Sequence, residues 1–400
     1  MDGTLIVSFL FIFLPNNISN WPIRSLYYAL PYLVLGLLVF FVGYREIWGR
    51  KRIGPKRLVF IFITFLFFFG LRWHIMSDTL AYEEEYYSFT TNFNWKYIND
   101  HSWWWDKGFV VFAMFCKIIS PNFFFFVFVN TLVDITLFSL CLKKYKVNIS
   151  ILILSFLAFQ GILQEINTMR NIKAILLFVY SISYIYDRRI LKYLTINFIG
   201  FFFHSSALLY FPMYWILNRK YSIKVLLPAL VIITIIYLAN INFLQDYLIS
   251  FVFSGESYVS EKVINYLGSS EEQTISLGFI ERLLTLTLCL LVYNKQKRNT
   301  FNLIVINSFF VFYFLYAIFG FNFVFRDRIP YLFIFAYWFL YPYLFDNYGR
   351  RGAIYKFAFL ALLFGKIYLS TRICSAYYET VLFHETTRTQ RQYLNDRLQN

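Results

Sequence analysis

Long apolar runs separated by short polar loops recur along the whole chain of 400 residues. These runs lack the alternating polar and apolar positions of membrane barrels, and they lack the continuous polar face of soluble helices. Helices are therefore the expected spanning element, because within lipid only helices and closed barrels satisfy the backbone. The pattern predicts an all-α polytopic integral membrane protein with about 10–12 transmembrane or re-entrant helices.

The helices expected from these runs cover residues 25–43, 58–71, 108–119, 123–142, 149–163, 172–186, 190–217, 225–243, 279–293, 301–319, 329–345 and 353–370. The run over 108–119 would give only about 18 Å of helix, so it is expected to be re-entrant or interfacial. An apolar segment at 5–14 is either a short first span or an interfacial helix. A cleavable signal is not expected there, because Asp2 replaces a basic start and Pro15 follows where small residues are needed.

Hydrophobic residues make up 59% of the chain, which agrees with membrane insertion. The net charge of +15 would also suit a nucleic-acid-binding protein. Lys and Arg lie mainly in short loops between apolar runs, however, where they act as topology signals, so nucleic acid is not an expected partner. The cysteines lack metal-ligand spacing and are expected to be packing residues: Cys116, Cys141, Cys289 and Cys374.

Charge also sets the expected orientation. Basic residues crowd the loop over 44–57, which is therefore expected on the cytoplasmic side. Acidic residues dominate two outer loops, at about 72–107 and 244–278. The tail over 371–400 is expected outside, as a polar helix or a disordered end without a catalytic role. No soluble domain boundary interrupts the pattern, so residues 1–400 are expected to form a single integral membrane domain.

The run over 190–217 has basic residues at both ends, so both ends are expected on the cytoplasmic side. The run is too short for two complete spans, and His204, Ser205 and Ser206 interrupt its middle. A helical hairpin that dips into the membrane, with His204 near its tip, is favoured. A single tilted helix is the alternative.

Four arginines adjoin apolar spans on the outer side, where the positive-inside rule predicts few: Arg72, Arg170, Arg326 and Arg328. One such arginine would usually be a snorkelling residue at a helix end. Four together favour a functional set. The planar guanidinium binds phosphate oxygens with two hydrogen bonds, and diphosphate is the obvious membrane-associated anion.

Other polar residues near these arginines are candidates for chemistry. Asp78 and Tyr82 lie in the first outer loop, where a carboxylate can take a proton from a substrate hydroxyl. His204 is either a hydrogen-bonded structural residue or a base or phosphate ligand. Glu165 is expected to pair with Arg170 or Lys173, as a structural ion pair or to orient the arginine.

The remaining polar groups of the first outer loop have simpler interpretations. Glu83 and Glu84 are expected to form a solvated acidic face. Trp103, Trp104 and Trp105 can stack on sugar rings, but tryptophan at a membrane interface is ordinary composition, and that interpretation is favoured.

Several cofactor and metal motifs are missing from the sequence. It has no glycine-rich nucleotide loop and no His/Cys cluster with metal spacing. The segment Arg326-Asp327-Arg328 places its acid between two bases and is a poor substitute for a metal-binding acidic pair. No metal and no cofactor are therefore expected.

A set of short motifs occurs in a fixed order: Gly70-Leu71-Arg72, Ser77-Asp78-Thr79 with Tyr82, Lys107-Gly108-Phe109-Val110, Asn167-Thr168-Met169-Arg170, Asp187-Arg188-Arg189, and Phe203-His204-Ser205-Ser206-Ala207-Leu208. Together they resemble the EpsG family, relatives of the Wzy polysaccharide polymerases, over residues 60–220. Farther along, Arg326, Arg328 and Tyr331 are similar to a later part of the family pattern. The chain departs from that pattern at Asp106-Lys107, where the family has Glu-Pro, and at Asn171, where it has Gln.

The resemblance implies a polymerase of lipid-linked repeat units for a capsule, exopolysaccharide or O-antigen, in the cytoplasmic (inner) membrane of a bacterium. The donor and the acceptor would be glycans on polyprenyl diphosphate, and a chain-length regulator and a flippase would be partners. Arg170, Arg72 and Arg326 or Arg328 would stabilise the departing diphosphate, while Asp78 or His204 takes the acceptor proton. Tyr82, Glu165 and Asn167 would contact substrate.

Two other functions fit parts of the pattern. A flippase for the same lipid-linked glycan would also place arginines in a cavity, but it should show two similar halves, which the sequence lacks. A ligase-type polyprenyl-dependent glycosyltransferase would share the chemistry and differ in its acceptor.

Overall fold

The computed structural model describes residues 18–49, 51–101, 106–240, 275–296, 300–320, 322–349 and 352–397. The predicted segment at 5–14, the three tryptophans Trp103–Trp105 and most of the second outer loop at 244–278 lie outside these residues. The described chain is almost entirely helical, and its β-pairing is confined to isolated bridges. Six of the described helices are long and apolar enough to cross a membrane. The prediction of an all-α polytopic membrane protein is confirmed.

The chain divides into two compact units. Unit 1 consists of Met1–Tyr180, Phe198–Ser205 and Tyr341–Asn400, and unit 2 of Ser181–Asn197 and Ser206–Leu340. The helices that lie within unit 1 are η1 (Ile18–Asn20), α2 (Leu26–Ile47), α3 (Pro55–Gly70), α4 (Asp78–Ser88), α5 (Trp95–His101), α6 (Lys107–Ile119), α7 (Phe123–Lys144), α8 (Ile149–Phe156), η2 (Leu157–Gly161), α9 (Ile162–Ile166), α20 (Ala353–Thr371), η5 (Cys374–Ala376) and α21 (Arg388–Asp396).

The helices of unit 2 are α12 (Met213–Ile216), α13 (Ile223–Leu238), α16 (Leu277–Gln296), α17 (Thr300–Ile318), α18 (Phe323–Arg328) and η4 (Pro330–Phe333). The elements that have residues in both units are α10 (Asn171–Tyr186), α11 (Ile190–Phe203), η3 (Ser205–Tyr210) and α19 (Phe335–Gly349). The bounds of the long apolar helices follow the predicted runs, because each run ends where charged or turn-forming residues begin. The helices α4 and α5 lie in the predicted outer loop over 72–107, where no helix was expected.

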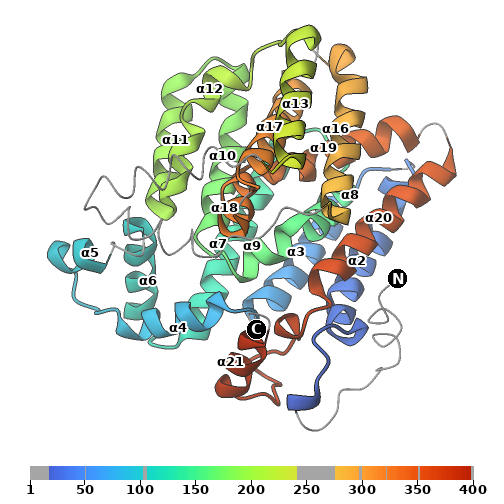
Figure 1. Cartoon of the computed structure of the whole chain (residues 1–400). Coiled ribbons are helices and arrows are strands. Elements are labelled where there is room, and N and C mark those ends of the chain that lie inside the picture. The colour runs from blue at the N-terminus through green and yellow to red at the C-terminus, as the bar shows by residue number, and fades with distance from the viewer. Residues whose placement is uncertain are drawn as a thin grey trace. The chain divides into compact units, whose positions relative to one another are not determined.

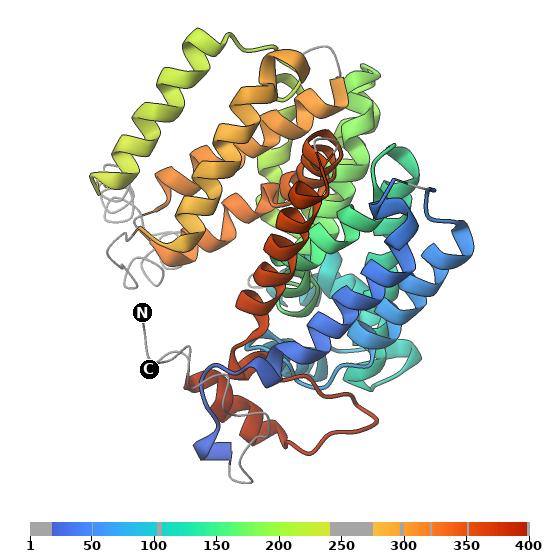
Figure 2. The ribbon, with the colours of Figure 1, turned by 90° about the vertical axis from the view of Figure 1, so that its right-hand side faces the viewer.

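In unit 1, α2 packs against α3, α8 and α20, and α7 packs against α3 and α6 (Figure 1, Figure 2). The helices α2 and α8 approach closely because Gly43 faces Ser150, where an added Cβ would lie 2.2 Å from the serine Oγ. In unit 2, α17 packs against α13, α16 and α18.

The most buried membrane helix is not continuous. Residues Ile149–Ile166 form one apolar segment, and most of its residues are buried. It contains the π-type turn η2, in which Gln160 has a φ of 63°. The break separates α8 from α9. Glu165 lies near the end of α9, just before the loop that precedes α10.

The hairpin predicted over 190–217 is present. After α11 the chain turns at His204 and doubles back, so that the Tyr193 hydroxyl donates a hydrogen bond to the Tyr210 carbonyl. The rings of Tyr193 and Tyr214 also lie 5.3 Å apart. His204 therefore occupies the tip of the hairpin, as its position in the sequence predicts.

The C-terminal tail is an ordered part of unit 1. Arg391 of α21 is buried and forms an ion pair with Glu379, with 2.5 Å between Nη2 and Oε2. Thr387 caps α21 through a capping box with Gln390. Cys374 and Arg397 bond to the backbone of Ile23 and Trp21, and Figure 2 shows the tail beside the first described residues.

The tail also corrects the prediction for Glu83, which is not part of a solvated face. Glu83 is buried, and its Oε2 lies 2.9 Å from both His74 Nε2 and Arg388 Nε. Glu84 is exposed and binds Arg388 as well. The sequence could not reveal this contact, because the partners lie at opposite ends of the chain.

Candidate active site

The loop between α9 and α10 holds the arginine singled out by the sequence. Arg170 Nη1 donates to Asp106 Oδ2 at 2.9 Å, and the Arg170 side chain is also hydrogen-bonded to Tyr82. The side chains of Arg170 and Asp106 are 22% and 13% exposed, so they are shielded but can be reached by a ligand. Tyr82 is buried beneath them.

Asp106 connects this arginine to the tip of the hairpin. Its Oδ1 accepts the backbone amide of Ser205, the residue after His204, at 2.8 Å. The end of α11 can reach Asp106 because Gly108, the second residue of α6, lies against Phe202, where an added Cβ would lie 2.8 Å from the Phe202 carbonyl oxygen. The glycine of the Lys107-Gly108-Phe109 motif therefore has a steric role.

Asp78 begins α4 and is fixed by the same loop. Its backbone amide donates to Asn167 Oδ1 at 2.9 Å, and its carboxylate interacts electrostatically with Arg170 and Tyr82. We name the set Asp78, Tyr82, Asp106, Asn167 and Arg170 the outer cluster, after the side of the membrane on which the sequence predicts it. Its members come from motifs that are separate in the sequence.

The protonation of two members of the outer cluster follows from their neighbours. Burial disfavours a charged guanidinium, but Tyr82 and Asp106 outweigh it and hold the pKa of Arg170 above its ordinary value. Burial raises the pKa of Tyr82, and the charge of Asp78 adds to the effect. Arg170 is therefore a permanent cation, and Tyr82 keeps its proton.

Four further ionisable side chains of unit 1 are buried, and we name them the buried quartet: Arg72, Asp134, Glu165 and Lys173. Lys173 Nζ donates to Asp134 Oδ2 at 2.9 Å and to Asn130 Oδ1 at 2.6 Å. Arg72 Nη2 donates to the Glu165 carbonyl at 3.2 Å. Formal charges in the quartet balance, as burial in a membrane helix bundle requires.

The predicted pair of Glu165 with Arg170 or Lys173 is not formed among the described residues. Arg170 binds Asp106 and Lys173 binds Asp134, while the Glu165 side chain lies near Arg72 and Thr131. Arg72 is 1% exposed, so its contacts hold the end of α9 in place from within the protein.

Asp134 and Asn130 were not among the sequence candidates. Asp134 is the only acidic residue in the apolar run over 123–142, and a lone acid within a membrane helix is a signal that could have identified it. Its partner Lys173 stands out in the sequence for the same reason.

In unit 2, Arg326 and Arg328 belong to α18. Arg326 is half-buried, with 3.3 Å between its Nε and Asp327 Oδ1, and Arg328 is exposed. A further arginine, Arg282 of α16, stacks on the Tyr316 ring at 4.1 Å. The sequence analysis passed over Arg282, although a cation within an apolar helix is the same kind of signal.

Within the described part of the chain, no group of three His, Cys, Asp or Glu side chains could hold a metal ion. The four cysteines are buried free thiols.

Comparison with known protein families gives a match over most of the chain. The model of the EpsG family matches residues 57–382, a range that includes every member of the outer cluster and of the buried quartet. No curated protein and no solved structure matches the chain.

Proposed function

The chain belongs to the EpsG family, and from that membership we propose that it is a polysaccharide polymerase of a bacterial cytoplasmic membrane. At the level of the family, membership supports a polymerase-like function related to exopolysaccharide. The finer proposal is that the protein moves a growing glycan from polyprenyl diphosphate to a lipid-linked repeat unit on the outer face. The observation that carries it is the half-buried Arg170, held by Asp106 and Tyr82 beside Asp78.

The proposed reaction is a glycosyl transfer. The terminal hydroxyl oxygen of the acceptor repeat attacks the anomeric carbon of the donor, and the bond from that carbon to the diphosphate oxygen breaks. The electron pair of the broken bond leaves with polyprenyl diphosphate. The hydroxyl proton passes to a base on the protein, so charge and atoms balance without a metal or a nucleotide.

Arg170 stabilises the leaving group in this proposal. Negative charge grows on the diphosphate as the bond breaks, and a fixed cation in a shielded site lowers the energy of that state. Asp106 and Tyr82 act as positioning residues, because they hold the guanidinium in place before substrate arrives.

Asp78 and His204 are the two candidates for the base. Asp78 lies at the start of α4 within the outer cluster, and His204 precedes the residue that Asp106 holds. Asn167 orients the start of α4. Arg72 and Glu165, of the buried quartet, are positioning residues in this proposal. The diphosphate-binding role proposed for Arg326 and Arg328 rests on their places in the sequence.

The proposal is tested by gel analysis of surface glycan in a strain that lacks the gene. Single repeat units on the lipid carrier are expected, with long chains restored by the wild-type gene. Repeat units trapped on the cytoplasmic side would instead identify the protein as a flippase. Long glycan chains that are not attached to their acceptor would identify it as a ligase. A chain-length regulator is the expected partner. Deleting that regulator should broaden the distribution of glycan lengths, and only in a strain that contains this protein.

A further inference from the structure

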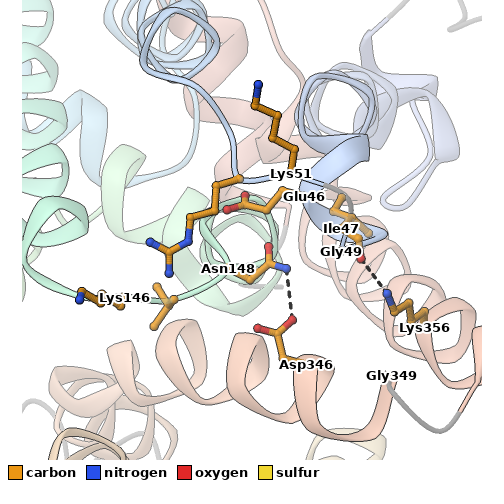
Figure 3. Close-up of a pocket in the computed structure, with 11 residues that line it drawn as sticks. Glu46, Ile47, Gly49, Lys51, Lys146, Asn148, Asp346, Gly349 and Lys356 are labelled. Carbon is orange, nitrogen blue, oxygen red and sulfur yellow. Dashed lines mark hydrogen bonds between the residues drawn. The ribbon is translucent and has the colours of Figure 1, made fainter.

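Unit 1 contains a polar cavity of about 430 Å³ at the ends of its membrane helices that lie opposite the outer cluster. Its walls come from the end of α2, the loop after α2, the segment before α8, the end of α19 and the start of α20. Figure 3 shows Glu46 and Asn148 in the centre, Asp346 and Lys356 on one side and Lys51 on the other. The sequence places these helix ends on the cytoplasmic side, away from the outer cluster.

The cavity has more positive than negative charge. Four cations line it, namely Lys51, Arg52, Lys146 and Lys356, against the two acids Glu46 and Asp346. Three of the cations are exposed, and Lys51, Arg52 and Lys146 form no ion pair with any described residue.

The two acids do not neutralise those three cations. Glu46 is buried, and its Oε2 accepts the backbone amide and the hydroxyl of Ser150 at 2.9 and 2.6 Å. The negative charge of Glu46 therefore offsets the partial positive charge at the N-terminus of α8. Asp346 accepts the side-chain amide of Asn148 at 3.3 Å. Lys356 is also engaged, because it donates to the Ile47 carbonyl at 3.0 Å at the end of α2 (Figure 3).

We propose that this cavity binds the phosphate of an anionic phospholipid headgroup, of the phosphatidylglycerol type. Lys51, Arg52 and Lys146 supply the donors for the phosphate oxygens. Asp346 and Asn148 supply oxygens that accept hydrogen bonds from headgroup hydroxyls. The cavity lies where four membrane helices end, which is the depth of the headgroups.

The experiment measures lipid binding by the purified full chain. Melting temperature and retained lipid, counted by native mass spectrometry, are compared in phosphatidylcholine nanodiscs with and without phosphatidylglycerol. The cavity variant is Lys51→Gln/Arg52→Gln/Lys146→Gln. The control is Arg189→Gln/Lys192→Gln/Lys220→Gln, which removes the same charge from exposed positions on the same predicted side.

Phosphatidylglycerol is expected to raise the melting temperature of the wild type and of the control. The cavity variant should bind the lipid roughly a hundredfold more weakly, since three basic contacts are lost. Inorganic phosphate in detergent could stabilise the wild type to the same extent, with this stabilisation lost in the cavity variant. The cavity would then bind phosphate, but its ligand would be a soluble phosphate and not a lipid. Equal losses in the cavity and control variants, or no lipid effect on the wild type, would overturn the proposal. None of these readouts depends on polymerase activity.

Discussion

Arg170 and Asp106 lie 64 positions apart in the sequence and form a direct ion pair, with 2.9 Å between Nη1 and Oδ2. The second carboxylate oxygen of Asp106 holds the amide of Ser205. One acid therefore joins the loop before α10 to the tip of the hairpin that follows α11. Changes at either residue should affect the same step of the proposed reaction.

Replacing Arg170 by Ala should reduce chain elongation by about 10²–10³-fold, the usual cost of losing one donor to a developing oxyanion. Arg170→Lys keeps the charge but loses the planar fork, so partial activity is expected. The measurement is glycan length on a gel at matched levels of membrane-inserted protein. Arg219→Ala, at an exposed arginine outside the family motifs, is the control and should leave chain length unchanged. Normal glycan length with Arg170→Ala would exclude the leaving-group role.

Asp106→Asn should lower elongation less than Arg170→Ala does, because the guanidinium remains but loses a charge-assisted hydrogen bond. The informative variant is the double mutant. If Asp106 acts through Arg170, Asp106→Asn should add almost nothing in the Arg170→Ala background. If the double mutant instead loses elongation rate by the product of the two single losses, Asp106 contacts the substrate directly.

Gly108→Ala should destabilise unit 1 by about 1–3 kcal/mol and reduce elongation, because the new methyl group meets the backbone of Phe202. Thermal unfolding in detergent measures the first effect and glycan length the second. Gly365→Ala in α20 is the matched control, since an added Cβ there has no neighbour within 4 Å. Equal melting temperatures for the two variants would show that α6 can move away from α11.

The helices of this protein could be predicted from the sequence because each apolar run is bounded by charged or turn-forming residues. The run over 123–142, for example, corresponds to α7, which begins after the capping residue Asn122 and ends at Lys144. Even the hairpin with His204 at its tip follows from the positive-inside rule. These features depend on local composition, which a single sequence contains.

The partners of the polar residues could not be predicted in the same way. Asp106 lies 64 positions from Arg170, and the acids Glu165, Asp134 and Asp187 are nearer in the sequence, so only the fold brings Asp106 and Arg170 together. Arg388 of the tail pairs with Glu83, 305 positions away. Because a polar tail has no apolar period, the burial of Arg391 could not be predicted from its sequence.

The buried quartet predicts a specific pattern of stabilities. Lys173→Met alone should destabilise the protein by about 3–5 kcal/mol, because it leaves Asp134 buried and unpaired. The double variant Lys173→Met/Asp134→Leu should recover most of that loss. Thermal unfolding in detergent measures both, with Lys192→Met at an exposed position as the control. If the double variant is no more stable than the single one, Lys173 stabilises the bundle mainly through Asn130 or the Met169 carbonyl.

Docking of the tail should weaken in acid. The pKa values of Glu83 and Glu379 both lie below the ordinary value of a glutamate. At Glu83, burial would raise the pKa, but contacts with His74 and Arg388 lower it more. At Glu379, Arg391 and Thr386 outweigh burial in the same way. A lowered folded pKa means that the stabilisation is complete above the unfolded pKa of about 4.3 and is lost as pH falls through the folded values.

The measurement is the melting temperature of the purified chain from neutral pH down to below pH 4. Glu379→Gln should be less stable at neutral pH and should show a flatter decline in acid, because it has already lost the charge that binds Arg391. Glu385→Gln, at an exposed acid of the same tail, should behave as the wild type. If Glu379→Gln and the wild type decline in parallel, the acid sensitivity arises outside the tail, and the Glu379–Arg391 pair does not control docking.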